Sequence, residues 1–326
     1  MQIIEAEQII NNNPKHARAP YSPEYEKGSA YTQDTYRPID QGVVPITDAG
    51  FIHADAAYDV VSASGGYMFR MQDHLKRFTA SCEKFGLVNP YSEEETEEIL
   101  TNLVKLAGLK DAYIWWAVTR GELEDGDRVK AQYVNKFYAF VTPYLFIHGD
   151  ELRTRGTKVK ISTDYIRIPP QAVDPTAKNF HWMDMKLSIF EAINSGAEWS
   201  VLTDADGFLT EAPGCNVFLI KDGIVITPDS GCLEGITRQT VFDLAEELDL
   251  GLEVRKVPAQ ELVDADEAFL TSTAGGIMPI SQINDRPLGG HNGPGEQTTQ
   301  LHNLYWEKRW AGWLGDPIDY DTPPTL

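Results

Sequence analysis

Apolar residues recur every three or four positions in several stretches of the chain, which is the period of a helix with one buried face. In the stretch 72–85 this stripe consists of Leu75, Phe78, Cys82 and Phe85. Gly86 follows directly, and glycine commonly ends a helix because it adopts the left-handed conformation at little cost. The pattern predicts an amphipathic helix that ends at Gly86.

A second helix is predicted for 92–107. Ser92 and Glu95 have the spacing of a capping box, in which each side chain binds a backbone N–H at the helix start. Gly108 is expected to end this helix.

Two further helices are expected in the second half of the chain. The helix after residue 182 should bury Met183, Leu187 and Phe190 and end at Gly196. The helix that opens near Thr237 should end at Gly251 and bury the set Val241, Leu244, Ala245 and Leu248.

Runs rich in aromatic and β-branched residues predict strands. The run "AAYDVVSASGGYMFRM" is typical of a hairpin around Gly65 and Gly66. Further strands are predicted by the runs "AYIWWAVTRG", "KFYAFVTPY", "TKVKIST" and "EAFLTS", and by hairpins around Asp206-Gly207 and Asp222-Gly223.

This mixture of hairpins and helices favours an α/β (α+β) chain with two domains. Residues 11–42 are polar and rich in Asn, Pro and Tyr, so we expect 1–42 to form an extended arm that packs on the protein. A small α/β domain is expected over 43–145 and a larger domain over 146–326, and we expect its hairpins and helices to curl into a barrel.

The net charge of the chain indicates which kinds of binding partner are disfavoured. The 28 basic residues are outnumbered by 49 acidic ones, giving a net charge of −21, which disfavours nucleic acid and anionic membranes as partners. We see no secretory signal, membrane-spanning run or Cys and His spacing typical of a metal site. The sequence therefore predicts a cytoplasmic protein without a structural metal.

Four separated features carry candidate chemistry: Lys178 in "DPTAKNFHW", Glu211 in "FLTEAPGCNVF", the segment "LEGITR" at 233–238, and "TSTAGG" at 271–276. A glycine before a helix start exposes backbone N–H groups, which suit a phosphate, and the hydroxyls of Thr237 and Thr273 could add donors. Each feature alone also fits a structural role, such as an exposed strand residue, a helix cap or a turn.

Taken together, the four features describe one cofactor. A lysine beside apolar residues is more easily deprotonated than the free side chain, and a neutral amine condenses with an aldehyde. A carboxylate beside a pyridine ring keeps the ring nitrogen protonated, so that the ring accepts electrons. An aldehyde, a pyridine ring and a phosphate together are pyridoxal 5′-phosphate (PLP).

The ordered set "AKNFHW", "LTEAPGCNVFLIKDG", "LEGITR" and "ADEAFLTSTAGGIMPI" resembles the fold type IV PLP enzymes over roughly residues 43–306. This family includes branched-chain and D-amino acid aminotransferases, aminodeoxychorismate lyase and (R)-selective amine transaminases. The resemblance implies a small α/β domain, a larger pseudo-barrel domain with PLP bound between them, and a homodimer in which a loop of the second subunit closes the site.

The resemblance also assigns roles to residues of this chain. It implies that Lys178 is the Schiff-base lysine and proton shuttle, and that Glu211 binds the pyridine nitrogen. Arg77 in "HLKRF" looks like the phosphate-binding arginine, and Leu233 is expected to pack on the ring. The rest of the cofactor site is expected to consist of Gly235, Ile236, Thr237, Ser272 and Thr273.

The substrate positions resemble those of the (R)-selective amine transaminases. His53, Tyr58 and Val60 of this chain stand where those enzymes have a similar His, Tyr and Val pattern. Branched-chain enzymes hold the substrate carboxylate with an arginine where this chain has Trp115, and an indole cannot form a two-pronged carboxylate contact. The other expected substrate-binding residues are Tyr113, Trp182 and Ala274, and aromatic side chains here should favour an apolar or aryl substituent. Arg128 is the candidate for holding the keto-acid carboxylate, although it lies about two positions from the family pattern.

The sequence therefore predicts a PLP-dependent transaminase that moves an amino group from (R)-configured primary amines to an α-keto acid such as pyruvate. The nearest alternative is a branched-chain or D-amino acid aminotransferase. A lyase of the aminodeoxychorismate type and a non-catalytic binding protein on the same scaffold are further alternatives.

Overall fold

The computed structural model describes residues 1–124, 132–290 and 293–325. Its contacts divide the chain into two compact units. One unit comprises residues 10–145, 177–180 and 309–326, and is called the lysine unit because it contains Lys178. The other comprises residues 1–9, 146–176 and 181–308, and is called the glutamate unit because it contains Glu211. The chain passes from the glutamate unit to the lysine unit within helix α1 (Ala6–Asn12), and again within helix α9 (Glu296–Trp310).

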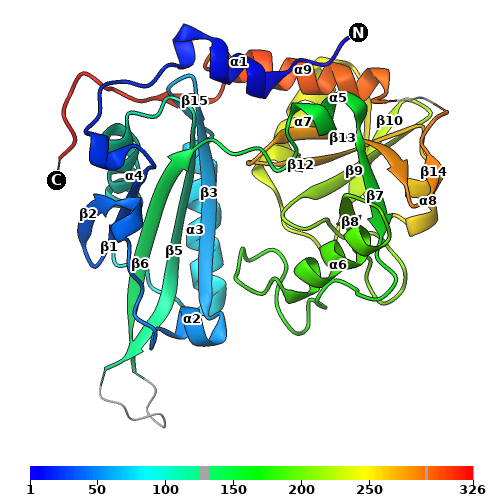
Figure 1. Cartoon of the computed structure of the whole chain (residues 1–326). Coiled ribbons are helices and arrows are strands. Elements are labelled where there is room, and N and C mark those ends of the chain that lie inside the picture. The colour runs from blue at the N-terminus through cyan, green and yellow to red at the C-terminus, as the bar shows by residue number, and fades with distance from the viewer. Residues whose placement is uncertain (125–131, 291–292, 326) are drawn as a thin grey trace. The chain divides into compact units, whose positions relative to one another are not determined.

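The lysine unit is built on one sheet with the strand order β15-β4-β3-β5-β6-β1-β2 among the described residues (Figure 1). The long neighbours β3, β5 and β6 pair antiparallel, with Val60 opposite Trp115 and Trp115 opposite Phe140. The strands are β1 (Ser29–Thr32), β2 (Thr35–Pro38), β3 (Ala56–Ser64), β4 (Tyr67–Phe69), β5 (Ala112–Leu123), β6 (Tyr133–Pro143) and β15 (Gly315–Pro317).

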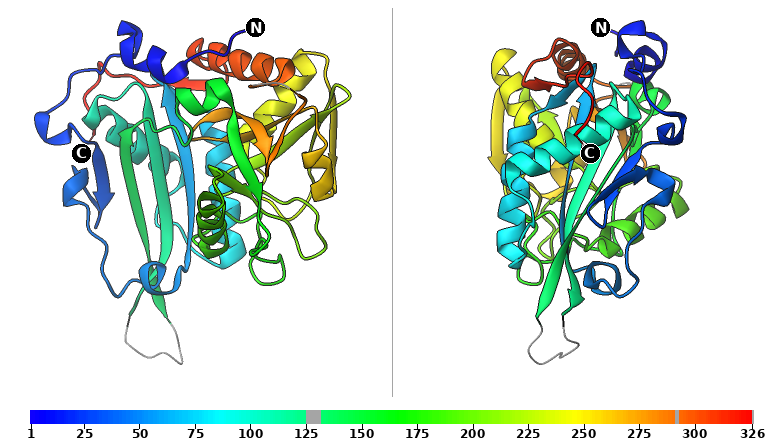
Figure 2. Two further views of the ribbon diagram at one scale, coloured as in Figure 1. Left: turned by 45° about the vertical axis from the view of Figure 1, so that its right-hand side comes forward. Right: turned by 90° about the vertical axis from the view of Figure 1, so that its left-hand side faces the viewer.

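Helices α3 (Met71–Phe85) and α4 (Glu93–Ala107) cover one face of this sheet (Figure 2). Apolar side chains from these helices and from alternate strand positions, including Phe78, Leu103 and Trp116, form the core. Because side chains alternate along a strand, Tyr58, Trp115 and their neighbours two positions away lie on the opposite face. That face carries the short helix α2 (Ala49–His53) at one end.

Several sequence predictions for this unit are confirmed. Gly86 and Gly108 end α3 and α4 in the left-handed conformation, and both hydrogen bonds of the Ser92–Glu95 capping box are present. The arm expected over 1–42 is not extended throughout, because residues 29–38 form the β1–β2 hairpin and β1 pairs with β6. Its backbone groups are thus satisfied by the sheet.

The glutamate unit contains a second sheet, with the order β11-β10-β9-β12-β13-β7-β8 in the described part of the chain and β14 paired to β13. Its strands are β7 (Thr157–Ile161), β8 (Trp199–Val201), β9 (Asn216–Lys221), β10 (Ile224–Pro228), β11 (Gly251–Arg255), β12 (Glu267–Ser272), β13 (Gly276–Ile283) and β14 (Arg286–Pro287). Its other helices are α5 (Asp150–Arg155), α6 (Met183–Asn194), α7 (Ile236–Glu247) and α8 (Ala259–Val263). The expected hairpin at Asp222-Gly223 joins β9 to β10.

Two helix predictions for this unit need correction. The buried face of α6 consists of Met185, Ser188, Ile189 and Ala192, whereas Met183 and Phe190 are exposed. Ser188 takes the inward position because its hydroxyl is 2.8 Å from that of Ser200 on β8. Helix α7 ends at Glu247, and Gly251 does not stop it but begins strand β11.

The expectation of a mixed α/β chain with two sheet-based parts is confirmed. No helix among the described residues is both long enough and apolar enough to span a bilayer. The same residues contain no group of three His, Cys, Asp or Glu side chains arranged to hold a metal ion.

Candidate active site

Lys178 is fixed to the edge of strand β3 by its own backbone. Its carbonyl accepts a 3.0 Å hydrogen bond from the Tyr58 N–H, and its N–H donates at 3.1 Å to the hydroxyl of Ser81 on α3. The next residue, Asn179, forms an antiparallel bridge with Ala57. With the main chain held at three points, the Lys178 Nζ lies 4.4 Å from the centroid of the Tyr58 ring, where an aromatic face attracts an ammonium group.

Arg77 belongs to a buried charged group beneath the same strand. Its Nε and Nη2 donate to the two oxygens of Asp59 at 2.8 and 2.7 Å, a two-pronged ion pair. His74 Nδ1 lies 2.8 Å from Asp59 Oδ1, which fits a neutral imidazole donating to the carboxylate. Asp59, His74 and Arg77 are called the arginine cluster.

The electrostatics of the arginine cluster keep Asp59 ionised. Burial alone would raise the pKa of this carboxyl, but the charge of Arg77 and the hydrogen bonds from His74 and Arg77 hold it well below its usual range. Burial lowers the pKa of His74, and Arg77 and Lys178 lower it further against the opposing effect of Asp59. Sequence reasoning selected Arg77 but missed Asp59 and His74. A charged residue inside the apolar run "AAYDVVSA" was the available signal.

In the glutamate unit, Glu211 is buried and accepts a hydrogen bond on each of its carboxylate oxygens. Arg167 Nε donates to its Oε1 at 2.8 Å, and the Leu233 N–H donates to its Oε2 at 3.1 Å. Arg167 also donates from Nη1 to Asp184 Oδ2 at 2.7 Å. Glu211, Arg167 and Asp184 form a chain of alternating charges, called the glutamate triad. Arg167 and Asp184 were not among the residues selected from the sequence.

The segment 233–237 brings an uncapped helix start next to this carboxylate. The Leu233 carbonyl accepts a 2.7 Å hydrogen bond from Asn216 Nδ2, which fixes the loop that leads into α7. No side chain of the described residues caps α7, so its first N–H groups are available to an anion. A side chain at Gly235 would place its Cβ 2.1 Å from Asn216 Oδ1, so this close approach requires glycine. Thr237, in the first turn, is buried.

The remaining candidates of this unit lie in two loops. Ser272, Thr273 and Ala274 occupy the turn between β12 and β13, where the Ala274 N–H is 3.3 Å from the Ser272 hydroxyl. Trp182 precedes α6, and its ring lies against Gly214, where a Cβ would be 3.0 Å from Trp182 Cη2. The positive φ of +69° at Gly214 disfavours a larger residue for a second reason.

The expected substrate residues of the lysine unit, other than His53 and Arg128, share one sheet face. Strand pairing places Tyr58 and Val60 on β3 beside Tyr113 and Trp115 on β5, all pointing away from α3 and α4. His53 ends α2 and is exposed. Arg128 lies outside the described residues.

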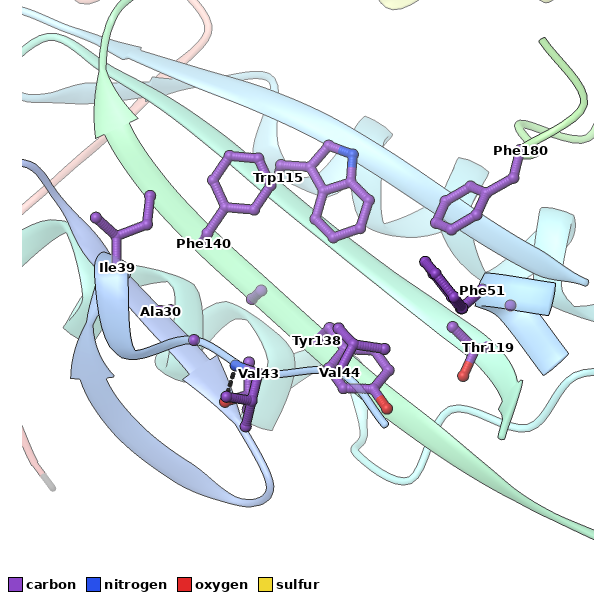
Figure 3. A pocket seen from close by; sticks show the side chains of 14 residues that line it. Ala30, Ile39, Val43, Val44, Phe51, Trp115, Thr119, Tyr138, Phe140 and Phe180 are labelled. Carbon is purple, nitrogen blue, oxygen red and sulfur yellow. Dashed lines mark hydrogen bonds between the residues drawn. The ribbon is translucent and has the colours of Figure 1, made fainter. Parts of the chain in front are cut away.

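Trp115 is the centre of an aromatic group on this face. Its ring stacks on Phe140 at a centroid distance of 5.1 Å and lies 5.9 Å from both Tyr58 and Phe180. Trp115, Phe140 and Phe180 also line an apolar cavity of about 510 Å³, together with Val43, Val44 and Phe51 (Figure 3). The aromatic group therefore connects the Tyr58 ring, over which Lys178 lies, with an apolar cavity large enough for a small ligand.

A family model for the class IV aminotransferases matches residues 56–283, which is more than half of the chain. The chain belongs to the class IV aminotransferases. Enzymes of this class use PLP, so the protein is a PLP-dependent transaminase.

Relatives of known name agree with this family. The chain is 32% identical over 260 residues to a branched-chain-amino-acid aminotransferase of Pseudomonas aeruginosa, covering 79% of this chain and 83% of that protein. It is 29% identical over 255 residues to a D-alanine aminotransferase of Bacillus licheniformis, covering 77% and 87% of the two chains.

Solved structures show the same fold. The branched-chain amino acid aminotransferase of Escherichia coli superimposes with a TM-score of 0.84 at 22% identity, covering 90% of this chain and all of that one. The branched-chain aminotransferase of the archaeon Thermoproteus uzoniensis, solved with norvaline, gives a TM-score of 0.81 at 24% identity, again covering 90% of this chain and all of that one.

The residues present fit the chemistry of PLP. Lys178 has an amine of the kind that condenses with an aldehyde, and Glu211 is a buried carboxylate of the kind that pairs with a ring nitrogen. The start of α7 has N–H groups of the kind that bind a phosphate. Because Gly235 approaches Asn216 closely, a side chain at this position is disfavoured, and its absence leaves the helix start open.

Proposed function

We propose that this aminotransferase takes its amino group from (R)-configured primary amines with an apolar or aryl substituent and passes it to an α-keto acid such as pyruvate. The observation that carries this proposal is the position of Trp115. Branched-chain enzymes hold the substrate carboxylate with an arginine at the matching position, whereas here an indole stacks on Phe140 and lines an apolar cavity. Placing a carboxylate against these rings would remove it from water without the compensating positive charge that an arginine supplies.

The proposed roles of the chain follow from its contacts. PLP supplies an aldehyde that condenses with amines and a ring that accepts the electron pair left when a proton leaves the donor carbon. Lys178 would hold the cofactor and then carry that proton, with its backbone fixed by Tyr58 and Ser81. Glu211 would hold the ring nitrogen's proton, while Arg77, the start of α7 and Thr273 would bind the phosphate. The cavity lined by Trp115 would receive the apolar substituent and exclude water.

A branched-chain or D-amino acid aminotransferase is the second candidate, and the names of the curated relatives favour it over the first. This candidate requires a cationic group that binds the substrate carboxylate. Arg128, which lies outside the described residues, is the candidate that the sequence offers for such a group.

A donor panel separates the two candidates. Each enantiomer of 1-phenylethylamine is assayed as amino donor with pyruvate as the acceptor. Leucine and D-alanine are assayed as donors with 2-oxoglutarate as the acceptor. The proposal predicts turnover of the (R)-amine, little turnover of the (S)-amine, and weak activity with the amino acids. Activity confined to leucine or D-alanine would establish the second candidate instead. The lyase alternative is tested separately, with aminodeoxychorismate as substrate and no amino acceptor, where release of pyruvate would indicate a lyase.

The variant Trp115→Arg refines this test. It should lower the KM for an amino acid donor and raise that for the (R)-amine, because it adds a carboxylate-binding cation and removes aromatic surface. Val88→Arg adds the same charge at an exposed position of the lysine unit and should leave both values unchanged.

A homodimer is part of the same proposal. Beside the cavity, the large apolar side chains of Val44, Ile46, Phe51 and Ile52 are between 46% and 78% exposed, and a second copy of the chain would cover them. Sedimentation should show a dimer that Phe51→Glu weakens, and a concentration-independent monomer would contradict it.

A further inference from the structure

The glutamate triad contains more charge than is needed to position one carboxylate. The side chains of Arg167 and Asp184 are largely buried, with exposures of 5% and 12%, and that of Glu211 has an exposure of 5%. Two carboxylates and one guanidinium give the triad a single net negative charge. Because water screens such buried charges little, the charge of Asp184 acts on Glu211 through Arg167.

Geometry fixes each member of the triad. The Arg167 N–H donates to the Thr203 carbonyl at 2.8 Å, and its side chain bridges Glu211 Oε1 and Asp184 Oδ2. The Ile168 N–H donates to the same Asp184 oxygen at 2.7 Å. Asp184 Oδ1 is buried without a hydrogen-bond partner among the described residues, so its charge is balanced mainly by Arg167. Although burial alone would lower it, Glu211 and Asp184 raise the pKa of Arg167 above its ordinary value.

A positive charge directly behind Glu211 has two consequences. It stabilises the ionised carboxylate, but it would also repel a protonated ring nitrogen bound by that carboxylate. Without Asp184, the Arg167–Glu211 pair would have no net charge and would stabilise a proton on the ring nitrogen only weakly. With Asp184, the net negative charge is restored while Glu211 stays ionised and oriented.

We propose that Arg167 and Asp184 are positioning residues that set the proton affinity of the cofactor's ring nitrogen through Glu211, Asp184 raising it and Arg167 lowering it. This inference rests on the proposed role of Glu211 as the partner of that nitrogen. The two residues thus adjust how strongly the ring withdraws electrons, without contacting substrate.

The thiol of Cys232, which also interacts electrostatically with Glu211, does not add to the charge of the glutamate triad. Burial and then the charge of Glu211 raise the pKa of the Cys232 thiol to about 12, so the thiol is neutral at physiological pH. Arg238, Glu234 and Asp229 also act on that thiol. Glu211 and Asp184 both form ion pairs with Arg167.

The test uses enzyme reconstituted with PLP that carries ¹⁵N in the ring, and follows the ¹⁵N chemical shift against pH. Asp184→Asn should lower the midpoint of ring-nitrogen deprotonation by about one pH unit, equivalent to about a tenfold change in proton affinity. Arg167→Gln should shift it in the opposite direction. Asp206→Asn removes the same charge from an exposed position in the segment that leads to Glu211, and should leave the midpoint unchanged.

Opposite shifts would support the proposal, because loss of a merely structural contact would move both variants in the same direction. Shifts of the same sign, or an Asp184→Asn midpoint equal to that of the wild type, would overturn it. If Asp184→Asn does not retain the cofactor, Arg167→Gln decides alone, and a lowered or unchanged midpoint refutes the proposal. Glu211→Gln tests the underlying role: an unchanged ¹⁵N shift in that variant would instead refute Glu211 as the ring partner.

Discussion

At the scale of single residues, the arginine cluster depends on one carboxylate. Asp59 is fully buried and binds both Arg77 and His74, so its removal leaves a largely buried guanidinium without its counter-charge. Breaking a buried ion pair in this way typically costs about 3–5 kcal/mol. The same change would release the side chain that we propose as a phosphate ligand.

We therefore expect Asp59→Asn to lower the free energy of unfolding by about 3 kcal/mol and to weaken PLP binding. The depressed pKa of Asp59 adds a pH signature. Its stabilising effect is present above the unfolded-state pKa of about 4 and is lost as the pH falls towards the lower folded value. Denaturant titrations at neutral and acidic pH measure both effects. Asp40→Asn, at an exposed position of the same unit, is the control, and equal stabilities of the two variants would contradict the prediction.

Residues with a local sequence signature could be selected from the sequence, whereas their supporting residues could not. Lys178, Glu211 and the segment 233–238 stand in recognisable motifs. Arg167 and Asp184 lie 44 and 27 positions from Glu211, and no local pattern links residues so far apart. Asp59 was detectable in principle, because a carboxylate inside an apolar strand needs a buried counter-charge.

At the scale of elements, the errors among the predicted helices were the end of α7 and the face of α6. The capping box of α4 depends on Ser92 and Glu95 alone and is confirmed. The face of α6 was wrong because apolar residues occur on both of its sides, so periodicity does not select one. The β1–β2 hairpin was missed because its turn residues, Gln33 and Asp34, have positive φ but are not the Asn-Gly or Asp-Gly pair typical of such turns.

Removal of the α4 cap gives a prediction at this scale. Ser92→Ala should destabilise the protein by about 1 kcal/mol, because the Glu95 N–H loses its hydroxyl acceptor at the helix start. Chemical denaturation measures the loss. Ser230→Ala, in an exposed loop, serves as the control and should change stability by less than about 0.5 kcal/mol. A Ser92→Ala effect no larger than that of the control would show that the cap contributes nothing.

At the scale of the whole molecule, two buried histidines in the glutamate unit make stability dependent on pH. Burial lowers the pKa of His148 to about 4 and that of His302 to about 4. In the structure, His302 Nδ1 is 3.0 Å from Asn303 Oδ1, which also accepts a hydrogen bond from the Ile4 N–H. Protonation of His302 would place a charge among groups packed around a neutral ring.

The sign follows from linkage. The unfolded chain binds protons at each histidine below about pH 6.5, whereas the folded chain does so only near pH 4. Stability is therefore complete above pH 6.5 and falls by about 3 kcal/mol per histidine as the pH drops to 4. His302→Gln should reduce this acid sensitivity in thermal unfolding, and His53→Gln, at an exposed position, should not. Identical pH profiles for wild type and His302→Gln would contradict this account.

The division into two sheet-based parts was predictable from alternating runs of strands and helices, together with the resemblance to a known family. The assignment of residues 177–180 to the lysine unit was not predictable, because it depends on the pairing of Asn179 with Ala57 and on the bond from Lys178 to Ser81. These contacts have no signature in the local sequence.

The central claim is that Lys178 holds PLP, and chemical trapping tests it most directly. The holoenzyme is treated with borohydride and digested, and the peptides are examined by mass spectrometry. We predict a single phosphopyridoxyl group on the peptide that contains Lys178, and none on that peptide in Lys178→Ala. A phosphopyridoxyl group on another lysine, or wild-type protein left unlabelled after incubation with PLP, would contradict the account.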